Sequence, residues 1–395
     1  MQVWILKKFQ IERYILKIKK LEGDNLKKII FGITSLTIGG AERVLVDLAN
    51  KLSEEYDITI FTIYDGGELR KELNPRIKKV ALYRKQYKDL SKLQKIKASL
   101  RLMIYKKKIY GAIMKRGFET EVAFLEGPIT RLFSVKSKTK KIAWIHNDIS
   151  KVYGNGLKAK IKKIVDGQVY KKYDKLVFVS EENEKDFNKQ YKWIDDSKEV
   201  IIRNYIDYRK VIEKAEEKVD LPYDDKNINL LTVCRLVEQK ALDRFIKIQK
   251  DLEKDGIHTK IYIIGEGPLR YNLQKQIDSL GLTESFILLG KKENPYPYIK
   301  NCDYFCLLSY YEGYGMVLEE AKILGKPIIL TDTAARECAK GYSKSIILEN
   351  TKEGILKGLE KELKSDSIKY LKNTQNVEQN EKIEEAIIRK IKEIL

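Results

Sequence analysis

Short apolar runs alternate along the chain with stretches whose apolar residues recur at helical spacing. In the first half, residues 29–33 form an apolar run, residues 41–52 have helical periodicity, and residues 58–63 form a second run. This strand–loop–helix–strand order predicts a parallel, doubly wound sheet. Further strands of the first half are predicted at residues 121–125, 141–145, 175–179 and 200–202.

The second half repeats the alternation. Strands are predicted there at residues 229–234, 260–264, 286–289, 304–308, 327–330 and 345–348. Helices are predicted at residues 242–252, 269–280, 317–324 and after about Gly354. The polar stretch 208–228 contains Pro222 and is interpreted as a linker between two α/β halves.

The length of 395 residues exceeds an ordinary single core, so two domains are expected. We place an N-terminal domain at residues 26–207 and a C-terminal domain at residues 208–370. Residues 1–25 precede them, and a C-terminal helix at 371–395 is predicted to pack back on the N-terminal domain. There is no apolar run of membrane-spanning length and no secretion-signal pattern, so a cytoplasmic protein is expected.

Cysteine and histidine are scarce. The cysteines are Cys234, Cys302, Cys306 and Cys338, and no second ligand pair accompanies the close pair, so we interpret them as small buried residues. The two histidines, His146 and His258, are far apart in sequence, which argues against a histidine-rich zinc site.

The net charge of +20 lies almost entirely in the first half. Residues 1–200 hold 44 Lys and Arg against 25 Asp and Glu, whereas the remainder is nearly balanced. Residues 84–116, predicted to be helical, hold 12 Lys and Arg and a single acid, Asp89. A solvated basic face explains such a stretch, but the one-sided charge favours attraction to an anionic membrane surface. Residues 2–21 mix apolar and basic residues, which fits either an interfacial helix or a helix packed on the first domain.

Two motifs of the first half follow predicted strands. Gly40, preceded by Gly39, lies between a strand and a helix, where backbone amides can approach a phosphate. The sequence there matches neither G-x-G-x-x-G nor a P-loop, and a tight structural turn explains it equally well. His146 lies in Trp-Ile-His-Asn-Asp just past a strand, a position that favours a functional role over a structural one.

Two more motifs follow strands of the second half. Arg235 and Lys240 lie beyond the strand at 229–234, where open α/β sheets bind ligands, and two cations there suit a diphosphate. Surface charge would be the preferred explanation if this pair stood alone. Gly265 begins a Gly-Glu-Gly-Pro turn after the next strand, which either closes over a ligand or only leads into a helix.

The most specific motif is Tyr-Glu-Gly-Tyr-Gly-Met-Val-Leu-Glu-Glu-Ala-Lys-Ile-Leu-Gly-Lys-Pro at residues 311–327. Glu312 precedes a glycine-bracketed turn, a helix is predicted to begin near Gly315, and Glu320 lies inside that helix. Carboxylates suit sugar hydroxyls and helix amides suit phosphate, so this segment is predicted to bind a nucleotide sugar along its length. The alternative is an ordinary amphipathic helix with surface acids.

Taken together, these residues resemble the family 4 retaining glycosyltransferases, which have the GT-B fold of two Rossmann-like domains facing across a cleft. The resemblance covers about residues 29–337. Glu312 and Glu320, with seven residues between them, look like the family's E-x7-E motif, and the segments GGAER, WIHND, VSE, RNYID, CRLVEQK and GEGPL follow the family's order.

The resemblance implies a role for each matching position. Glu320 would hold the ribose, Glu312 the donor sugar, and Arg235 and Lys240 the diphosphate. His146 would sit at the reacting carbon. The remaining donor-binding positions implied are Gly40, Gly265, Gly313, Tyr314, Gly315, Met316 and Val317.

Two positions depart from the family pattern, because Cys234 and Ala241 stand where the family often has glycine. Both residues are small, so the site is expected to persist.

The expected function is transfer of a hexose or N-acetylhexosamine with retention and without a metal cofactor. A UDP-sugar is the favoured donor and GDP-mannose the second. The expected acceptor is a glycan or lipid-linked sugar of capsular or other envelope polysaccharide, at the inner face of the cell membrane. A glycoside hydrolase needs two carboxylates that flank the bond, which one segment does not supply. A basic nucleic-acid- or membrane-binding protein without transferase activity is the alternative from another class, although no nucleic-acid-binding motif is recognisable.

Overall fold

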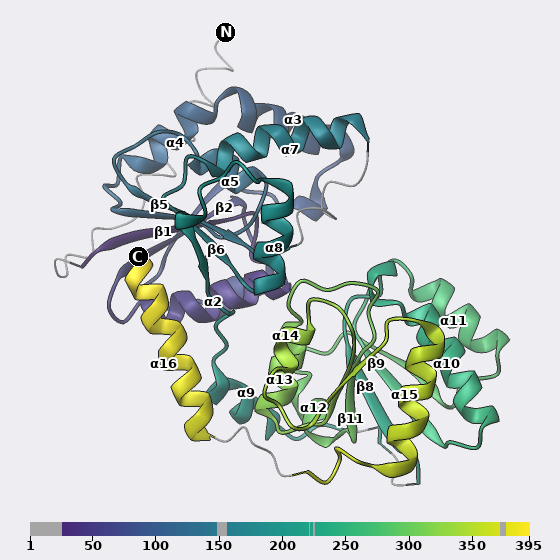
Figure 1. Ribbon diagram of the computed structural model, residues 1–395. Coiled ribbons are helices and arrows are strands. Elements are labelled where there is room, and N and C mark those ends of the chain that lie inside the picture. The colour runs from purple at the N-terminus through teal and green to yellow at the C-terminus, as the bar shows by residue number, and fades with distance from the viewer. Residues whose placement is uncertain (1–25, 148–155, 221, 224–225, 372–376) are drawn as a thin grey trace. The chain divides into compact units, whose positions relative to one another are not determined.

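A computed structural model describes residues 26–147, 156–220, 222–223, 226–371 and 377–395 (Figure 1). The predicted N-terminal segment 1–25 therefore lies outside the described residues. The chain divides into two compact units. The first unit comprises the described residues up to Phe178, with Asp186–Tyr205 and Ile391–Leu395, and the second comprises Val179–Lys185 and Ile206–Lys390.

The described residues of the first unit form a seven-stranded parallel sheet in the order β3-β2-β1-β4-β5-β6-β7. Its strands are β1 (Lys28–Ile33), β2 (Asp57–Tyr64), β3 (Lys78–Tyr83), β4 (Thr120–Ala123), β5 (Lys140–Ile145), β6 (Lys175–Phe178) and β7 (Glu199–Ile201). The inner strands are buried along nearly their whole length, as parallel strands covered on both faces must be.

Helices cover both faces of this sheet. Figure 1 shows α2 on one face and α4, α5 and α7 on the other. The helices of this part are α2 (Gly40–Leu52), α3 (Lys92–Ile104), α4 (Lys106–Met114), α5 (Pro128–Phe133), α7 (Leu157–Tyr170) and α8 (Glu181–Gln190), with short 3₁₀ turns η1 (Glu68–Glu72), η2 (Tyr87–Asp89) and η3 (Asp196–Lys198).

The described residues of the second unit form a six-stranded parallel sheet in the order β10-β9-β8-β11-β12-β13. Its strands are β8 (Ile228–Val233), β9 (Thr259–Ile264), β10 (Phe286–Gly290), β11 (Tyr304–Leu307), β12 (Ile328–Thr331) and β13 (Ser345–Leu348). Its helices are α9 (Tyr208–Ala215), η4 (Glu238–Lys240), α10 (Leu242–Lys254), α11 (Arg270–Ser279), α12 (Tyr296–Asn301), α13 (Met316–Ile323), α14 (Arg336–Ala339), α15 (Lys352–Ser365) and α16 (Val377–Ile394). The predicted α/β class with two doubly wound parallel sheets is confirmed.

Three details differ from the sequence-based predictions. The edge strand β3 was not predicted, because its apolar run has only four residues, Val80–Tyr83, and follows two lysines. The segment interpreted as a linker begins with α9, whose Tyr208, Val211 and Ala215 are buried, so residues 208–215 are part of the packed second unit. The basic stretch 84–116 is two helices, α3 and α4, which meet at Tyr105.

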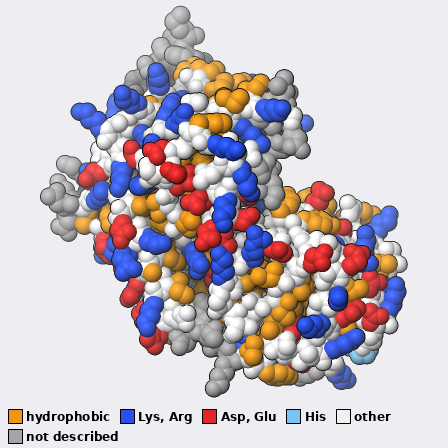
Figure 2. Space-filling model, in the orientation of Figure 1, with side chains coloured by type: hydrophobic (Ala, Val, Ile, Leu, Met, Phe, Trp, Pro, Cys, Tyr) orange, Lys and Arg blue, Asp and Glu red, His pale blue; other side chains and the backbone are white. Residues whose placement is uncertain are grey.

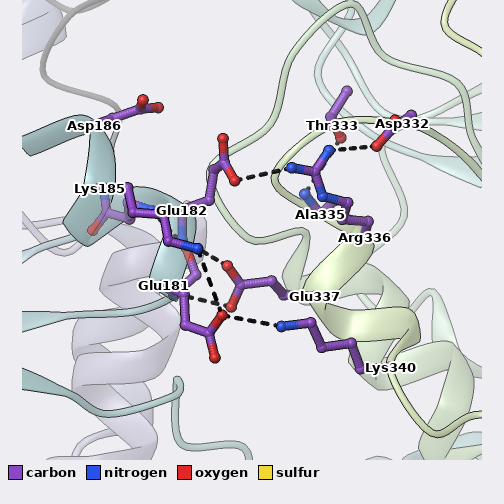
Figure 3. A network of polar contacts seen from close by, with 12 residues as sticks. Glu181, Glu182, Lys185, Asp186, Asp332, Thr333, Ala335, Arg336, Glu337 and Lys340 are labelled. Carbon is purple, nitrogen blue, oxygen red and sulfur yellow. Dashed lines mark hydrogen bonds and ion pairs between the residues drawn. The ribbon is translucent and has the colours of Figure 1, made fainter. Parts of the chain in front are cut away.

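The segment Val179–Lys185 groups with the second unit through a polar network (Figure 3). The carboxylate of Glu337 accepts hydrogen bonds from the backbone N–H groups of Glu181 (3.0 Å) and Glu182 (2.7 Å). Arg336 on α14 pairs with the Glu182 carboxylate at 3.0 Å. One carboxylate thus satisfies two free amides at the start of α8, where helix geometry favours negative charge.

The chain terminus closes the first unit, because the backbone carbonyl of Leu395 accepts a hydrogen bond from Thr120 Oγ1 at 2.6 Å. Lys392 pairs with Glu55 of the same unit at 2.6 Å. The last residues therefore belong to the core that contains β4.

Among the described residues, no helix is long and apolar enough to cross a membrane.

A buried ion pair joins the strands and helices of the first unit. Lys141 Nζ lies 2.9 Å from Glu121 Oε1 and also donates to the carbonyl of Phe133 at 2.8 Å. The Tyr110 hydroxyl on α4 donates to the same carboxylate at 2.6 Å. Both charged side chains are almost fully buried. Burial lowers the pKa of Lys141, and the Glu121 carboxylate opposes that shift.

Replacing Glu121 by Ala is expected to destabilise the first unit by about 3–5 kcal/mol, because it leaves a buried ammonium without its counter-charge. All three tryptophans, Trp4, Trp144 and Trp193, lie in the first half, so tryptophan fluorescence during urea unfolding reports on this unit. Glu378→Ala, which removes an exposed i,i+4 ion pair with Lys382, is the control and should change little. Equal midpoints for the two variants would contradict the expectation.

Candidate functional site

The second sheet has a topological switch point between β8 and β11. The chain leaves β8 toward β9 and β10 on one side and returns to β11 on the other. Loops that leave two such strands diverge and open a crevice at the carboxyl edge of the sheet, where α/β proteins bind ligands. The Arg235–Lys240 motif follows β8, and the Glu312 motif follows β11. Two of the predicted segments therefore flank the same crevice.

An ion pair joins these two loops directly. Lys240 Nζ lies 2.5 Å from Glu312 Oε1, and both side chains are largely buried. Two further hydrogen bonds join the same loops. The side-chain Nε2 of Gln239 donates to the carbonyl of Tyr311 at 2.9 Å, and the backbone N–H of Tyr310 donates to the carbonyl of Gln239 at 2.9 Å. The pair places one cation and one carboxylate, both predicted to bind the donor, at a single point.

Arg244 on α10 holds the loop after β11 from behind. Its guanidinium donates to the carbonyl of Leu308 at 2.7 Å and to Asn350 Oδ1 at 2.9 Å, and it stacks on the ring of Tyr310. Burial lowers the pKa of Arg244. The sequence analysis missed this residue, since an arginine inside a helical pattern reads as a surface charge.

The glycine turn after β9 packs against the loop after β8. Gly265 has a φ of +146°, and a Cβ at this position would collide with the carbonyl oxygen of Cys234. The N–H of Leu236 donates to the carbonyl of Glu266 at 3.0 Å. Gly265 is therefore needed for close backbone approach, and it fixes the loop that carries Arg235.

The two departures from the family pattern have different structural consequences. Ala241 adopts the left-handed conformation, with φ +51° and ψ +33°, which is where glycine is favoured, at a cost of about 1–2 kcal/mol for other residues. Burial raises the pKa of Cys234 to about 12, so its thiol is protonated at neutral pH. The interpretation of the cysteines as buried free residues is confirmed for Cys302, Cys306 and Cys338, whereas Cys234 is only half-buried by its accessible surface.

The helix predicted after the glycine turn is α13, and it begins at Met316 with Gly315 as its N-cap at φ +85°. Its first backbone N–H groups, including that of Val317, have no partner within the helix and point out of its N-terminus. The turn residue Gly313 is half-exposed, whereas the side chain of Tyr314 is buried. The backbone of this turn is therefore accessible to a ligand, whereas the buried side chain of Tyr314 holds the turn in place.

Two adjacent carboxylates on α13 have different surroundings. Glu319 accepts from the Tyr314 hydroxyl at 2.9 Å and pairs with Lys322 at 2.9 Å, so it is committed to the protein interior. Glu320 is half-exposed and accepts from the Tyr296 hydroxyl at 3.2 Å. Arg235 is exposed. A ligand can therefore reach Glu320 and Arg235, whereas the Glu319 carboxylate is held by Tyr314 and Lys322.

The remaining two predicted site residues lie in the first unit. Gly40 is the first residue of α2, at the carboxyl end of β1, and His146 follows β5 at the same edge of the sheet. The His146 ring is buried against Phe124, with centroids 4.8 Å apart, and its Nε2 has no hydrogen-bond partner among the described residues. Asp148, the last residue of that motif, lies outside the described residues.

Glu126 orients the loop that carries His146, and the sequence analysis did not single it out. Its Oε1 accepts from the backbone N–H groups of His146 and Asn147 (2.7 Å), and its Oε2 accepts from Asn147 Nδ2 at 3.2 Å. Burial raises the pKa of Glu126, and the hydrogen bonds from Asn147 oppose that shift. An acid at the end of a predicted strand, before Gly127, was the signal available in the sequence.

No group of three or more His, Cys, Asp or Glu side chains that could hold a metal ion occurs among the residues that the structure describes. A cavity of about 750 Å³ lies in the first unit between η1 and the start of β3. None of the predicted donor residues lines it; its lining is Gly67, Glu68, Arg70, Lys71, Pro75, Arg76, Ile77, Lys78 and Lys79.

Comparison with known proteins gives a family match, several relatives and a set of structures with the same fold. Residues 213–386 match the family model described as glycosyl transferases group 1. A Campylobacter jejuni N-acetylgalactosamine-N,N'-diacetylbacillosaminyl-diphospho-undecaprenol 4-alpha-N-acetylgalactosaminyltransferase is 28% identical over 362 residues, which cover 87% of this chain and 92% of the relative. An uncharacterized glycosyltransferase of Methanocaldococcus jannaschii is 25% identical over 74% of this chain and 73% of its own length.

Solved structures share the fold. The Anabaena protein HepE, in complex with UDP and glucose, superposes with a TM-score of 0.70 at 15% identity, covering 93% of this chain and all of HepE. Sucrose-phosphate synthase from Thermosynechococcus elongatus gives a TM-score of 0.73 at 13% identity over 93% and 98% of the two chains. Residues 213–386 are thus similar to group 1 glycosyl transferases, and the described part of the chain has the GT-B fold of its solved-structure neighbours.

Proposed function

We propose that the protein transfers a hexose or N-acetylhexosamine from a nucleotide sugar, with retention, to a glycan or lipid-linked acceptor. The Lys240–Glu312 pair at the switch point carries this proposal, because it joins a diphosphate-binding cation to a sugar-binding carboxylate. Arg235 beside it adds a second, exposed cation. These two cations take the leaving-group role that a metal has in other enzymes, so no metal cofactor is proposed.

A UDP-sugar is the favoured donor and GDP-mannose the second. The fold neighbour HepE was solved with UDP and with UDP-glucose, and two similar Campylobacter jejuni enzymes are N-acetylgalactosaminyltransferases. In the proposed complex, the ribose hydroxyls donate to Glu320, the sugar hydroxyls to Glu312, and the amides from Gly313 to Val317 face the sugar and the distal phosphate. The family 4 assignment and the E-x7-E role of these two acids are part of the proposal.

The lipid-linked acceptor is proposed from two observations. The two Campylobacter relatives are named for diphospho-undecaprenol-linked acceptors, and another relative is an amylovoran biosynthesis glycosyltransferase of Erwinia amylovora. The positive charge of this chain is concentrated in the first half, which suits an anionic acceptor or membrane. We therefore place the reaction in the synthesis of capsular or other envelope polysaccharide, in the cytoplasm at the inner face of the cell membrane.

The proposed chemical step is attack of an acceptor hydroxyl on the anomeric carbon from the face that the phosphate leaves. The acceptor oxygen forms the new glycosidic bond as the bond from carbon to phosphate oxygen breaks, and the departing phosphate takes the hydroxyl proton. Lys240 and Arg235 stabilise the negative charge of the nucleoside diphosphate as it forms. Because Lys240 is paired with Glu312, a diphosphate must compete with this carboxylate for the ammonium.

His146 and Gly40 of the first unit are also proposed to have the donor-binding roles that the family resemblance implies. Gly40 would bring the N-terminus of α2 to the donor phosphates. Burial lowers the pKa of His146 to about 3, so its ring is neutral at pH 7. A sugar hydroxyl would satisfy its unpartnered Nε2 without introducing a positive charge at the reacting carbon.

We expect UDP to raise the unfolding temperature of the purified chain in the presence of EDTA. Ligand at about a hundred times its dissociation constant stabilises a protein by about 2.7 kcal/mol. Glu320→Gln should weaken UDP binding by about tenfold, because the amide offers one neutral acceptor oxygen to the two ribose hydroxyls where the carboxylate offers two charged ones. Glu319→Gln, on the adjacent position of α13, is the matched control and should bind UDP normally, since its side chain faces Tyr314 and Lys322.

Equal loss in both variants would assign the effect to the stability of α13 and would remove the support for Glu320 as a ligand. If GDP alone raises the unfolding temperature, the proposed donor becomes GDP-mannose. No shift with any nucleotide, combined with salt-dependent binding to DNA, would favour the nucleic-acid-binding alternative.

The neutral state of His146 has a consequence for stability. Its pKa is about 6.5 in the unfolded chain and about 3 in the folded one, so the unfolded state takes up the proton first as pH falls. The contribution of His146 is therefore fully present above about pH 6.5 and is lost below it, by up to about 1.4 kcal/mol for each pH unit. His146→Asn should reduce the loss of stability between pH 7 and pH 5, measured by urea unfolding. Identical pH dependence in the two proteins would show that His146 is not buried as a neutral ring.

A further inference from the structure

Helix α3 exposes a continuous apolar stripe to solvent. Leu93, Ile96, Leu100, Met103 and Ile104 are all exposed, with 69% of Leu93, 69% of Met103 and 67% of Ile104 accessible. Their spacing of three, four, three and one places them within about a third of the helix circumference. A surface helix normally turns such a stripe toward the core. This helix does the reverse.

Another face of α3 makes the core contacts. Ala98 is buried there, and Leu102 packs against the core of the first unit. Lys97 and Arg101 flank the apolar stripe on one side, and Lys92 flanks it on the other. The helix therefore has three zones: a narrow core-facing side, a broad exposed apolar stripe, and cations along both borders of that stripe.

Helix α7 has the same character. Ile161, Ile164 and Val165, spaced three and one apart, are each more than half exposed, and Lys160 and Lys162 lie among them in the sequence. Figure 1 places α7 on the same face of the first sheet as α4 and α5, which connect it to α3 through successive helix contacts. Figure 2 shows hydrophobic side chains gathered in this part of the surface, with Lys and Arg around them.

We infer that the exposed apolar stripes of α3 and α7 are a docking surface that inserts into the headgroup region of an anionic lipid bilayer. Exposed apolar patches of this kind mark interaction sites, and an apolar stripe bordered by cations is the pattern of helices that lie in the membrane interface. The inference rests on the proposed lipid-linked acceptor and identifies the residues that would bring the first unit to it.

The charge around the stripes selects a bilayer over a protein partner. Residues 90–118, which contain all of α3 and α4, hold nine Lys and Arg and no acidic residue. A flat surface of a single charge sign complements anionic headgroups, each nearby cation adding about 1 kcal/mol of attraction. A second copy of this chain would bring the same positive charge to the interface and be repelled.

The test is co-sedimentation of the full chain with vesicles of phosphatidylglycerol and phosphatidylcholine, compared with vesicles of phosphatidylcholine alone. The unchanged chain should bind the anionic vesicles. Combined Leu93→Ser, Ile96→Ser, Leu100→Ser and Met103→Ser should weaken that binding by about tenfold or more, because the inserted apolar area is lost. Lys97→Glu with Arg101→Glu should also weaken it and reduce its salt sensitivity.

Tyr271→Ser with Tyr370→Ser is the matched control, because both rings are 77% exposed and belong to the second unit. It should bind vesicles like the unchanged chain. UDP stabilisation of every variant reports folding and donor binding independently of lipid. Unchanged vesicle binding by the Leu93-to-Met103 variant would overturn the inference. So would a change in oligomeric state with no change in vesicle binding, which would make the stripe a contact between copies. If the unchanged chain does not bind UDP, that result would instead contradict the proposed function.

Discussion

The ion pair between Lys240 and Glu312 is the interaction around which the second unit's crevice is organised. It forms because β8 and β11 are neighbours in the sheet although the chain visits β9 and β10 between them. The loops that leave the two strands diverge, and a long cation from one reaches a carboxylate from the other. Within the pair, each largely buried charge is neutralised by the other, so neither charge is left unpaired. A donor diphosphate can then replace one negative group by another at the same ammonium.

The surroundings of that pair are rigid where the proposed chemistry needs them to be. Gly265 allows the turn after β9 to touch the loop after β8, and Arg244 ties the loop after β11 to α10. Helix α13 begins at once after the glycine turn, so its free amides and Glu320 are fixed relative to Glu312 by the helix itself. Electrostatic stabilisation of a leaving group depends on such pre-oriented charges and dipoles. In this arrangement Glu319 stabilises the protein, whereas Glu320 can bind the ligand.

Most of the fold could be predicted because its inner strands are uninterrupted apolar runs, and the site motifs could be placed because they follow those strands. Prediction failed where tertiary contacts override local pattern. The edge strand β3 has too few apolar residues to stand out, and α9 was hidden in a polar stretch whose buried side, including Tyr208, appears only on packing. Glu126 was missed because its place after a predicted strand and before Gly127 does not reveal that it accepts from the backbone of His146. The solvent-facing stripe of α3 was likewise invisible, since periodicity does not tell which face is buried.

The account depends most on the claim that Lys240 exchanges Glu312 for the donor diphosphate. Isothermal titration of UDP into the Glu312→Gln variant tests it directly. Removing the negative charge removes both the competitor for Lys240 and its repulsion of the diphosphate, so UDP should bind about threefold to tenfold more tightly than to the unchanged chain. UDP lacks the sugar, so the lost sugar contact does not enter the measurement. Weaker binding of UDP to the variant would contradict the account, because it would mean that Glu312 supports the nucleotide itself.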